Sequence, residues 1–154
     1  MNTGALRDIR VVELGQLLAG PFCGQLLGDM GADVIKVEPP VTGDPMREWG
    51  QGAEKVQWEV IARNKRSVSA NLRIPEGQDI VRKLVAIADI LVENFKPGTL
   101  EKWGLSPEEL HAINPRLIYC SITGFGAAIT DASAELLQQG LAPTPRAALL
   151  RELF

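Results

Sequence analysis

The sequence is poor in the residues that most often mark metal, redox and hydrolytic sites. Its 154 residues include one histidine and two cysteines. His111 has no second histidine with which to bind a metal, and no serine lies in the Gly-x-Ser-x-Gly turn of a serine hydrolase. The cysteines, Cys23 and Cys120, are far apart and match neither a zinc pattern nor a redox motif. We expect both to be buried as small apolar side chains.

Excess basic charge and long apolar runs are also missing. A net charge of -3 argues against nucleic-acid binding by general neutralisation of phosphates. No apolar run approaches the length of a membrane helix, and the amino terminus shows no signal region. With 45% hydrophobic and 23% charged residues, the composition is that of a globular domain. We therefore expect a cytoplasmic protein without nucleic-acid or membrane partners.

The most informative segment is 11–38, which has the pattern of a β-loop-α-β unit. An apolar strand leads into a loop between Gly15 and Gly20, Pro21 suits a first helical turn, and Gly31 can end the helix before a second apolar strand. This order predicts an α/β fold with a Rossmann-like parallel sheet flanked by helices. Such sheets bind ligands beyond the carboxyl ends of their strands, so the loop is the first place to expect a substrate.

The loop does not contain a nucleotide-binding motif. A nicotinamide site needs a third glycine, whereas Leu17, Leu18 and Ala19 lie between the two glycines here. No Gly-Lys-Ser or Gly-Lys-Thr sequence follows, which excludes a phosphate loop of the nucleotide hydrolases. The glycines alone therefore predict close packing between strand and helix.

The rest of the chain up to residue 123 continues the alternation of strands and helices. We expect strands at 67–72, 89–93 and 117–123, and a helix or strand at 57–62. A helix should begin at Pro75, and Ser106 with Glu109 has the pattern of a capping box. The alternation supports a single α/β region.

Two polar segments could bind a ligand. The long loop 39–52 contains Asp44, Arg47 and Trp49 as candidate binding residues. The basic run 63–66 could bind a phosphate or carboxylate, although such a run is more often a solvated edge. The run by itself favours the solvated edge.

Nine short motifs, taken in their order along the chain, resemble the amino-terminal region of the family III CoA-transferases, the CaiB/BaiF or formyl-CoA transferase-like type. The resemblance covers about residues 6 to 126 and is carried by Val12–Leu14, Leu18–Pro21, Leu27–Glu38, Gly43–Asp44, Asn64–Ser67, Val92–Gly98, Trp103–Leu105, Asn114–Tyr119 and Ser121–Gly126. It implies a transferase that moves CoA between carboxylic acids, through an anhydride on an aspartate in the full-length family. It also implies acyl-CoA as a substrate rather than a permanently bound cofactor. Separately, the sequence has no cluster of His, Cys or paired acidic residues, which predicts that no metal is bound.

The resemblance implies a set of CoA contacts. By matching position these are Leu17, Leu18, Ala19, Ala70, Asn94, Phe95, Lys102 and Trp103. Where the family often has an arginine after the second strand, this chain has Pro39. Our hypothesis is that Lys102 and the run 63–66 supply the replacement charge.

The nucleophile of the family has no counterpart that we can identify, so the catalytic residue is left unassigned. Asp131 lacks the Gly-Tyr-Asp context, and we expect it to cap a helix. We therefore interpret residues 1–126 as a CoA-binding region, 127–154 as a divergent helical tail, and the chain as a fragment of doubtful activity. Alternatives are an inactive CoA-binding remnant and an acyl-CoA racemase, the latter disfavoured by the long segment 39–52. The remnant could pair with itself or with a full-length relative.

Overall fold

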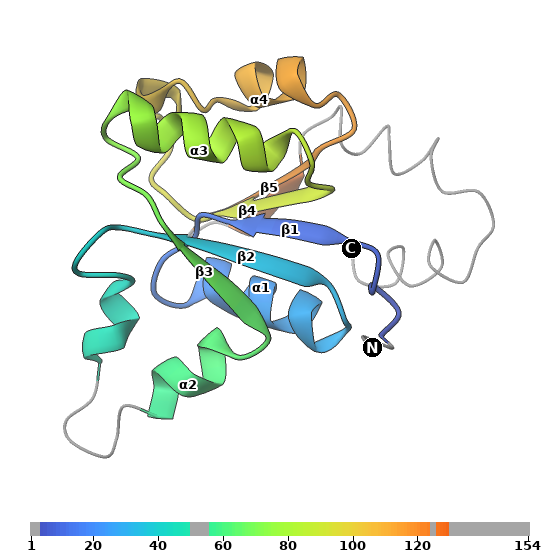
Figure 1. The fold of residues 1–154 in the computed structure, drawn as a ribbon, viewed down its shortest axis with the longest axis vertical. Coiled ribbons are helices and arrows are strands. Elements are labelled where there is room, and N and C mark those ends of the chain that lie inside the picture. Colours follow the sequence, from blue (N-terminus) through green and yellow to red (C-terminus); the bar gives the residue numbers. More distant parts are fainter. Residues whose placement is uncertain (1–3, 50–55, 124–125, 130–154) are drawn as a thin grey trace.

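The computed structural model describes residues 4–49, 56–123 and 126–129, which form a sheet with helices on both faces (Figure 1). In chain order the elements are β1 (Arg10–Glu13), α1 (Ala19–Asp29), β2 (Asp33–Glu38), the 3-10 helix η1 (Pro45–Glu48), α2 (Val56–Ala62), β3 (Lys65–Ser69), α3 (Pro75–Val85), β4 (Ile90–Glu93), the 3-10 helix η3 (Glu101–Trp103), α4 (Pro107–Ile113), β5 (Ile118–Thr123) and β6 (Gly126–Ile129).

The six strands are ordered β3-β2-β1-β4-β5-β6. Strands β1 to β5 are parallel, which confirms the predicted α/β class, and β6 pairs antiparallel with β5 at the edge. Residues 127–129 were predicted to begin a helical tail but belong to β6. The rest of the predicted tail, including Asp131, lies outside the described residues.

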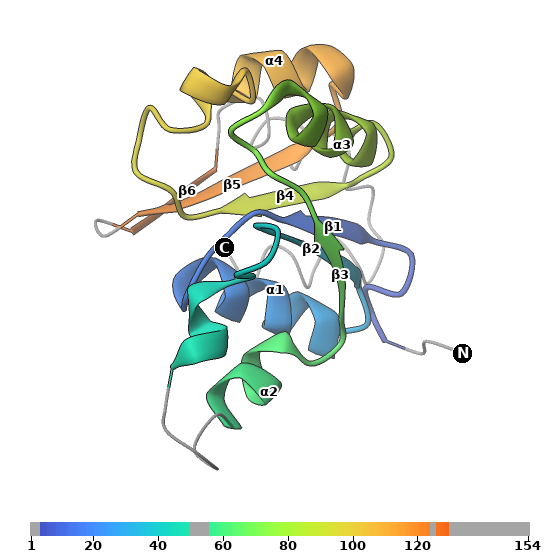
Figure 2. The ribbon, with the colours of Figure 1, turned by 60° about the vertical axis from the view of Figure 1, so that its left-hand side comes forward.

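Helices α3 and α4 cover one face of the sheet, while α1 covers the other with α2 beside it (Figure 2). Successive strand residues point to opposite faces. Val12 and Leu91 accordingly belong to the core cluster beneath α3 and α4, and their neighbours Val11 and Val92 to the cluster beneath α1. All four are fully buried, so the central strands β1 and β4 are covered on both sides.

Most predicted element ends are close to the observed ones. Gly31 follows α1 with a φ of 101°, a left-handed conformation that suits glycine. The capping box of α4 is present, since Ser106 Oγ accepts from Glu109 N at 3.2 Å and Ser106 N donates to Glu109 Oε2 at 2.9 Å. Helix α1 begins at Ala19, two residues before the expected Pro21, and the segment 57–62 is helical.

The two cysteines are free thiols in the core beneath α1. Cys120 is buried and Cys23, half-buried, packs against the same cluster. Among the described residues, no three His, Cys, Asp or Glu side chains are grouped so that they could bind a metal ion. None of the helices in the described part of the chain combines the length and the hydropathy that a membrane span requires.

Candidate functional site

A cleft of about 650 Å³ lies at the carboxyl ends of four neighbouring strands. Its walls come from the segments that follow β1, β2, β3 and β4. They are Leu14, Gln16, Val37, Glu38, Pro39, Pro40, Thr42, Gly43, Pro45, Ala70, Asn71, Leu72, Arg73, Phe95, Lys96, Thr99 and Trp103. The chain moves outward from β1 through β2 to β3 and then returns to place β4 on the other side of β1. The cleft therefore includes the point where strand order reverses, as ligand sites in open α/β sheets do.

One wall of the cleft is apolar and aromatic. Phe95 and Trp103 meet edge to face, with ring centroids 5.4 Å apart and an interplanar angle of 79°. Leu14 and Ala70 are buried beside them, at 1% and 4% exposed. This wall suits a flat or apolar part of a ligand.

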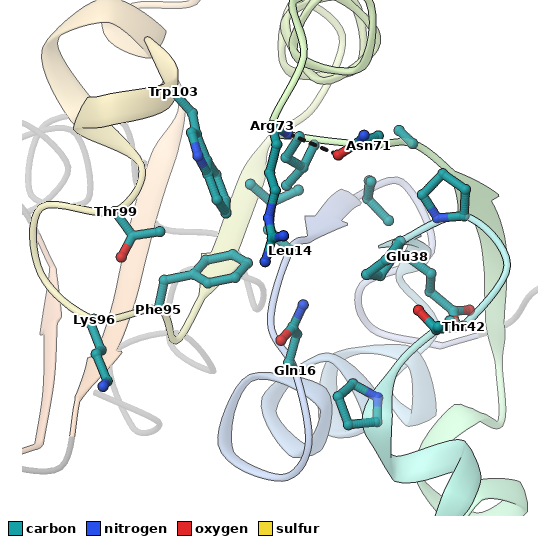
Figure 3. Close-up of a pocket in the computed structure, with 17 residues that line it drawn as sticks. Leu14, Gln16, Glu38, Thr42, Asn71, Arg73, Phe95, Lys96, Thr99 and Trp103 are labelled. Atoms are coloured by element: carbon teal, nitrogen blue, oxygen red, sulfur yellow. Dashed lines mark hydrogen bonds between the residues drawn. The ribbon is translucent and has the colours of Figure 1, made fainter.

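Two cations lie at this cleft, Arg73 and Lys96. Both are exposed, and within the described part of the chain neither makes an ion pair. The Arg73 side chain extends into the cleft, and Lys96 lies on the far side of Phe95 (Figure 3). The backbone amide of Arg73 donates to Asn71 Oδ1 at 3.1 Å, which holds this turn. The cleft thus offers an anionic ligand two free positive charges beside an aromatic wall.

The opposite wall is built around the carboxylate of Glu38. Arg47 donates to both its oxygens, at 2.7 and 2.8 Å, and Ser67 Oγ donates at 2.6 Å. The Asp44 backbone amide donates at 2.9 Å. Burial disfavours the charged form, but these hydrogen bonds outweigh burial and lower the pKa of Glu38 to about 2. Glu38 is therefore an ionised structural group whose acceptors are occupied.

The loop after β1 is fixed by close backbone contacts. A Cβ on Gly15 would lie 2.7 Å from the Gly20 Cα, so the two ends of the loop touch and both residues must be glycine. Asn94, just after β4, accepts from Gln16 N at 2.7 Å and donates to Gln16 O at 2.9 Å. The glycines thus have the predicted packing role, and Asn94 joins the β1 and β4 loops.

The structure brings together some of the predicted CoA contacts but not all. Ala70, Phe95 and Trp103 line the cleft. Leu17, Leu18 and Ala19 are exposed beside the cleft, between β1 and the first turn of α1. The Asn94 side chain is hydrogen-bonded to Gln16. Lys102 is an exposed residue of η3 that does not line the cleft. The sequence analysis included Gln16 only as part of the loop between Gly15 and Gly20, and it did not select Arg73, Lys96 or Thr99 as site residues. The available signal was their position just after predicted strands, where parallel sheets place ligands.

Two of the segments considered as ligand sites have structural roles. Arg63 pairs with Asp29 at 2.6 Å and Arg66 with Asp33 at 2.6 Å. Since the run 63–66 enters β3, it lies at the amino end of the strands, away from the cleft. The hypothesis that this run replaces the arginine expected at Pro39 is therefore wrong.

The loop 39–49 is tied into the fold as well. Asp44 is 1% exposed, and Arg47 is bound to Glu38 with its guanidinium 4.0 Å from the ring centre of Trp58. Asp44 and Arg47, which the sequence suggested as ligand contacts, instead hold the loop in place. The third candidate, Trp49, is exposed and is not among the residues that line the cleft, whereas Thr42 and Gly43 of the same loop are.

Comparison with known sequences identifies relatives of this architecture. The model of a family described as CoA-transferase family III matches residues 6–137. The chain is 61% identical over 124 residues to succinyl-CoA–D-citramalate CoA-transferase of Chloroflexus aurantiacus, covering 79% of this chain and 31% of that protein. It is 44% identical over 128 residues to human succinyl-CoA:glutarate CoA-transferase, covering 81% and 29%. The chain thus spans about a third of the length of these relatives.

Solved structures agree with the sequence comparison. A CaiB/BaiF family protein from Brucella suis is 52% identical, with a TM-score of 0.72 over 77% of this chain and 33% of that one. A protein of Mycobacterium tuberculosis is 32% identical, with a TM-score of 0.71 over 96% of this chain and 44% of that one. Since the family model covers most of the sequence, the chain belongs to the family III CoA-transferases.

Proposed function

We propose that this chain binds the CoA part of an acyl-CoA in the cleft, as the CoA-binding region of an enzyme that transfers CoA between carboxylic acids. The observation that carries this proposal is the aromatic wall of Phe95 and Trp103 next to two cations, Arg73 and Lys96, which form no ion pair with any other described residue. CoA presents an adenine ring together with a phosphorylated ribose and a diphosphate. The cleft offers a partner for each of these parts.

In this proposal each wall of the cleft contacts a different part of the CoA molecule. The adenine packs against Phe95 and Trp103, and Arg73 pairs with a phosphate in place of the arginine that Pro39 replaces. Lys96 adds a second positive charge on the other side of Phe95, and Lys102 one at the outer rim. The exposed loop Leu17–Ala19 then contacts the ligand from the β1 side.

The donor is proposed from the relatives. Proteins named as succinyl-CoA transferases are 61% and 44% identical to this chain. We therefore propose succinyl-CoA, or another short dicarboxylic acyl-CoA, as the donor. Carboxylic acids would be the acceptors.

The cleft residues support binding more directly than catalysis. Glu38 is the one acidic side chain among the described lining residues, and its oxygens are occupied by Arg47, Ser67 and the Asp44 amide. A nucleophilic carboxylate needs a free oxygen facing the thioester. The chain therefore acts as a binding part that either complements a nucleophile from elsewhere, in a homodimer or with a full-length relative, or is catalytically inactive.

Calorimetric titration of the 154-residue chain with CoA and succinyl-CoA tests the binding proposal. We expect saturable binding that weakens as salt is added, because phosphate contacts are screened. Arg73→Ala should weaken binding by about tenfold, the value of a charge-assisted hydrogen bond. Arg116→Ala is the matched control, since Arg116 is an exposed arginine that precedes β5 at the opposite end of the sheet.

The outcomes separate the versions of the proposal. No binding, or equal losses in the two arginine variants, would contradict a CoA site in this cleft. Turnover of succinyl-CoA with an added dicarboxylic acid would show an active or complemented transferase. Binding without turnover would support the inactive remnant.

A further inference from the structure

We propose that Lys36 and Asp44 are positioning residues that set the conformation of the loop 15–19 for the CoA ligand. The inference rests on the proposed function, because the loop is the β1 wall of that site. It concerns two buried residues that do not touch the cleft. The contacts that carry it join these side chains to the loop backbone.

Lys36 is a charged residue in the middle of a buried strand, and its ammonium lies close to three oxygen atoms. The side chain is 2% exposed. Its Nζ lies 2.8 Å from Glu13 Oε1, 2.7 Å from Asp44 Oδ2 and 2.9 Å from the Gly15 carbonyl oxygen. Two of its three donors make hydrogen bonds, to Glu13 and to the Gly15 carbonyl, and the contact with Asp44 is an ion pair. One of these acceptors is the backbone of the loop.

Asp44 reaches the same loop from the other side. Its Oδ1 accepts from Leu17 N at 3.1 Å and from Met46 N at 2.8 Å, while Oδ2 pairs with Lys36. The network thus holds the loop at the Gly15 carbonyl and at the Leu17 amide. These two contacts come from different segments, β2 and the loop before η1.

The charges of the network are balanced within the fold. Glu13 Oε2 pairs with Lys65 Nζ at 2.7 Å, and Lys65 also donates to the Pro21 carbonyl in α1 at 2.6 Å. Two acids and two lysines therefore neutralise one another. Buried ion pairs often contribute little to stability compared with apolar residues. A contribution to stability alone therefore does not explain why this network binds the Gly15 carbonyl and the Leu17 amide of the loop beside the cleft.

The conformation of the loop shows what the network achieves. Leu17 has a φ of 61°, in the left-handed region that non-glycine residues avoid. This conformation is disfavoured by roughly tenfold or more for a leucine, so it needs an external contact. The hydrogen bond from Leu17 N to Asp44 supplies one. In this conformation Leu17 and Leu18 are 36% and 50% exposed, and the preceding residue Gln16 lines the cleft.

The test compares variants that remove the contacts to the loop with a control variant that destabilises the fold by a similar amount but leaves those contacts in place. Asp44→Ala and Lys36→Met remove the two loop contacts, and Leu6→Ala removes a fully buried side chain that precedes β1 and belongs to the core cluster beneath α1, which contains no cleft-lining residue. CoA affinity is measured by titration and the Leu17 amide by hydrogen exchange, both under conditions where each chain is folded. We expect about tenfold weaker CoA binding and faster Leu17 exchange in the loop variants, because fewer molecules have the competent loop. Leu6→Ala should lower the unfolding temperature without either effect.

A second background makes the test specific for the left-handed residue. Glycine adopts a positive φ without the steric cost, so Asp44→Ala should reduce affinity less in a Leu17→Gly background than in the wild type. If Lys36→Met does not fold, Asp44→Ala, which removes the acceptor of the Leu17 amide, carries the test by itself. Wild-type affinity and exchange in the loop variants would overturn the proposal and leave the function intact. A wild-type chain that does not bind CoA would overturn both.

Discussion

Asn94 provides a sharp test of how the cleft is held together. Its side chain makes two hydrogen bonds to Gln16, at 2.7 and 2.9 Å, and Gln16 lines the cleft. Each such bond contributes about 1 kcal/mol, and leaving the Gln16 groups unpaired costs more, so Asn94→Ala should lower the free energy of unfolding by about 2 to 4 kcal/mol. CoA binding should weaken by about tenfold, since the β1 and β4 loops are no longer joined.

Asn114→Ala is the matched control. Asn114 donates to the carbonyl oxygens of Val85 and Ala88 at 2.9 and 2.8 Å and accepts from Arg116 N at 3.1 Å. Its loss should cost a similar free energy of unfolding, while it leaves the cleft unchanged. Urea unfolding and calorimetric titration measure the two quantities. Unchanged CoA affinity in Asn94→Ala, or an equal loss of affinity in Asn114→Ala, would refute the reasoning.

Three further predictions concern the stability of the fold. Folding lowers the pKa of Glu38 from 4.5 to about 2, so its contribution to stability is present above pH 4.5 and is lost as the pH falls toward 2. Urea unfolding across this range should show a loss of about 3 kcal/mol that Glu38→Gln lacks, because each pKa unit corresponds to about 1.4 kcal/mol. Ser106→Ala should lower the free energy of unfolding by about 1 kcal/mol through loss of the capping box, and Ser106→Thr by less. Gly24→Ala should destabilise by about 3 kcal/mol in thermal unfolding, because the new methyl group would overlap the buried Glu13 carboxylate, whereas Leu26→Ala on the exposed face should change stability by less than about 1 kcal/mol.

The parts of the fold that the sequence predicts are those with local signals. The strands, the helix and the turns within 11–38 are each predicted by residues that are neighbours in the sequence. Ser106 and Glu109 likewise form their capping box within one helical turn. The parallel order of the strands then places the ligand site at their carboxyl ends. Phe95 and Trp103 were selected through the family resemblance, and both line the cleft.

The roles of the charged residues could not be predicted because their partners lie far away in the sequence. Asp44 and Arg47 look like ligand contacts in an extended loop, but one pairs with Lys36 and the other with Glu38, both in β2. Lys36 itself interrupts an apolar strand and gives no local sign of burial. Arg73 follows the short β3, and only the order of the strands shows that it faces Phe95 across the cleft.

The cleft is assembled from four separate segments that meet only in the completed sheet. An unfolded chain has no such site, so any molecule that fits it must raise the melting temperature in proportion to the logarithm of its concentration. At a hundred times the dissociation constant the gain is about 2.7 kcal/mol, several degrees for a domain of this size. A melting screen over a panel of thioesters would therefore rank acyl groups even in a protein that turns none of them over.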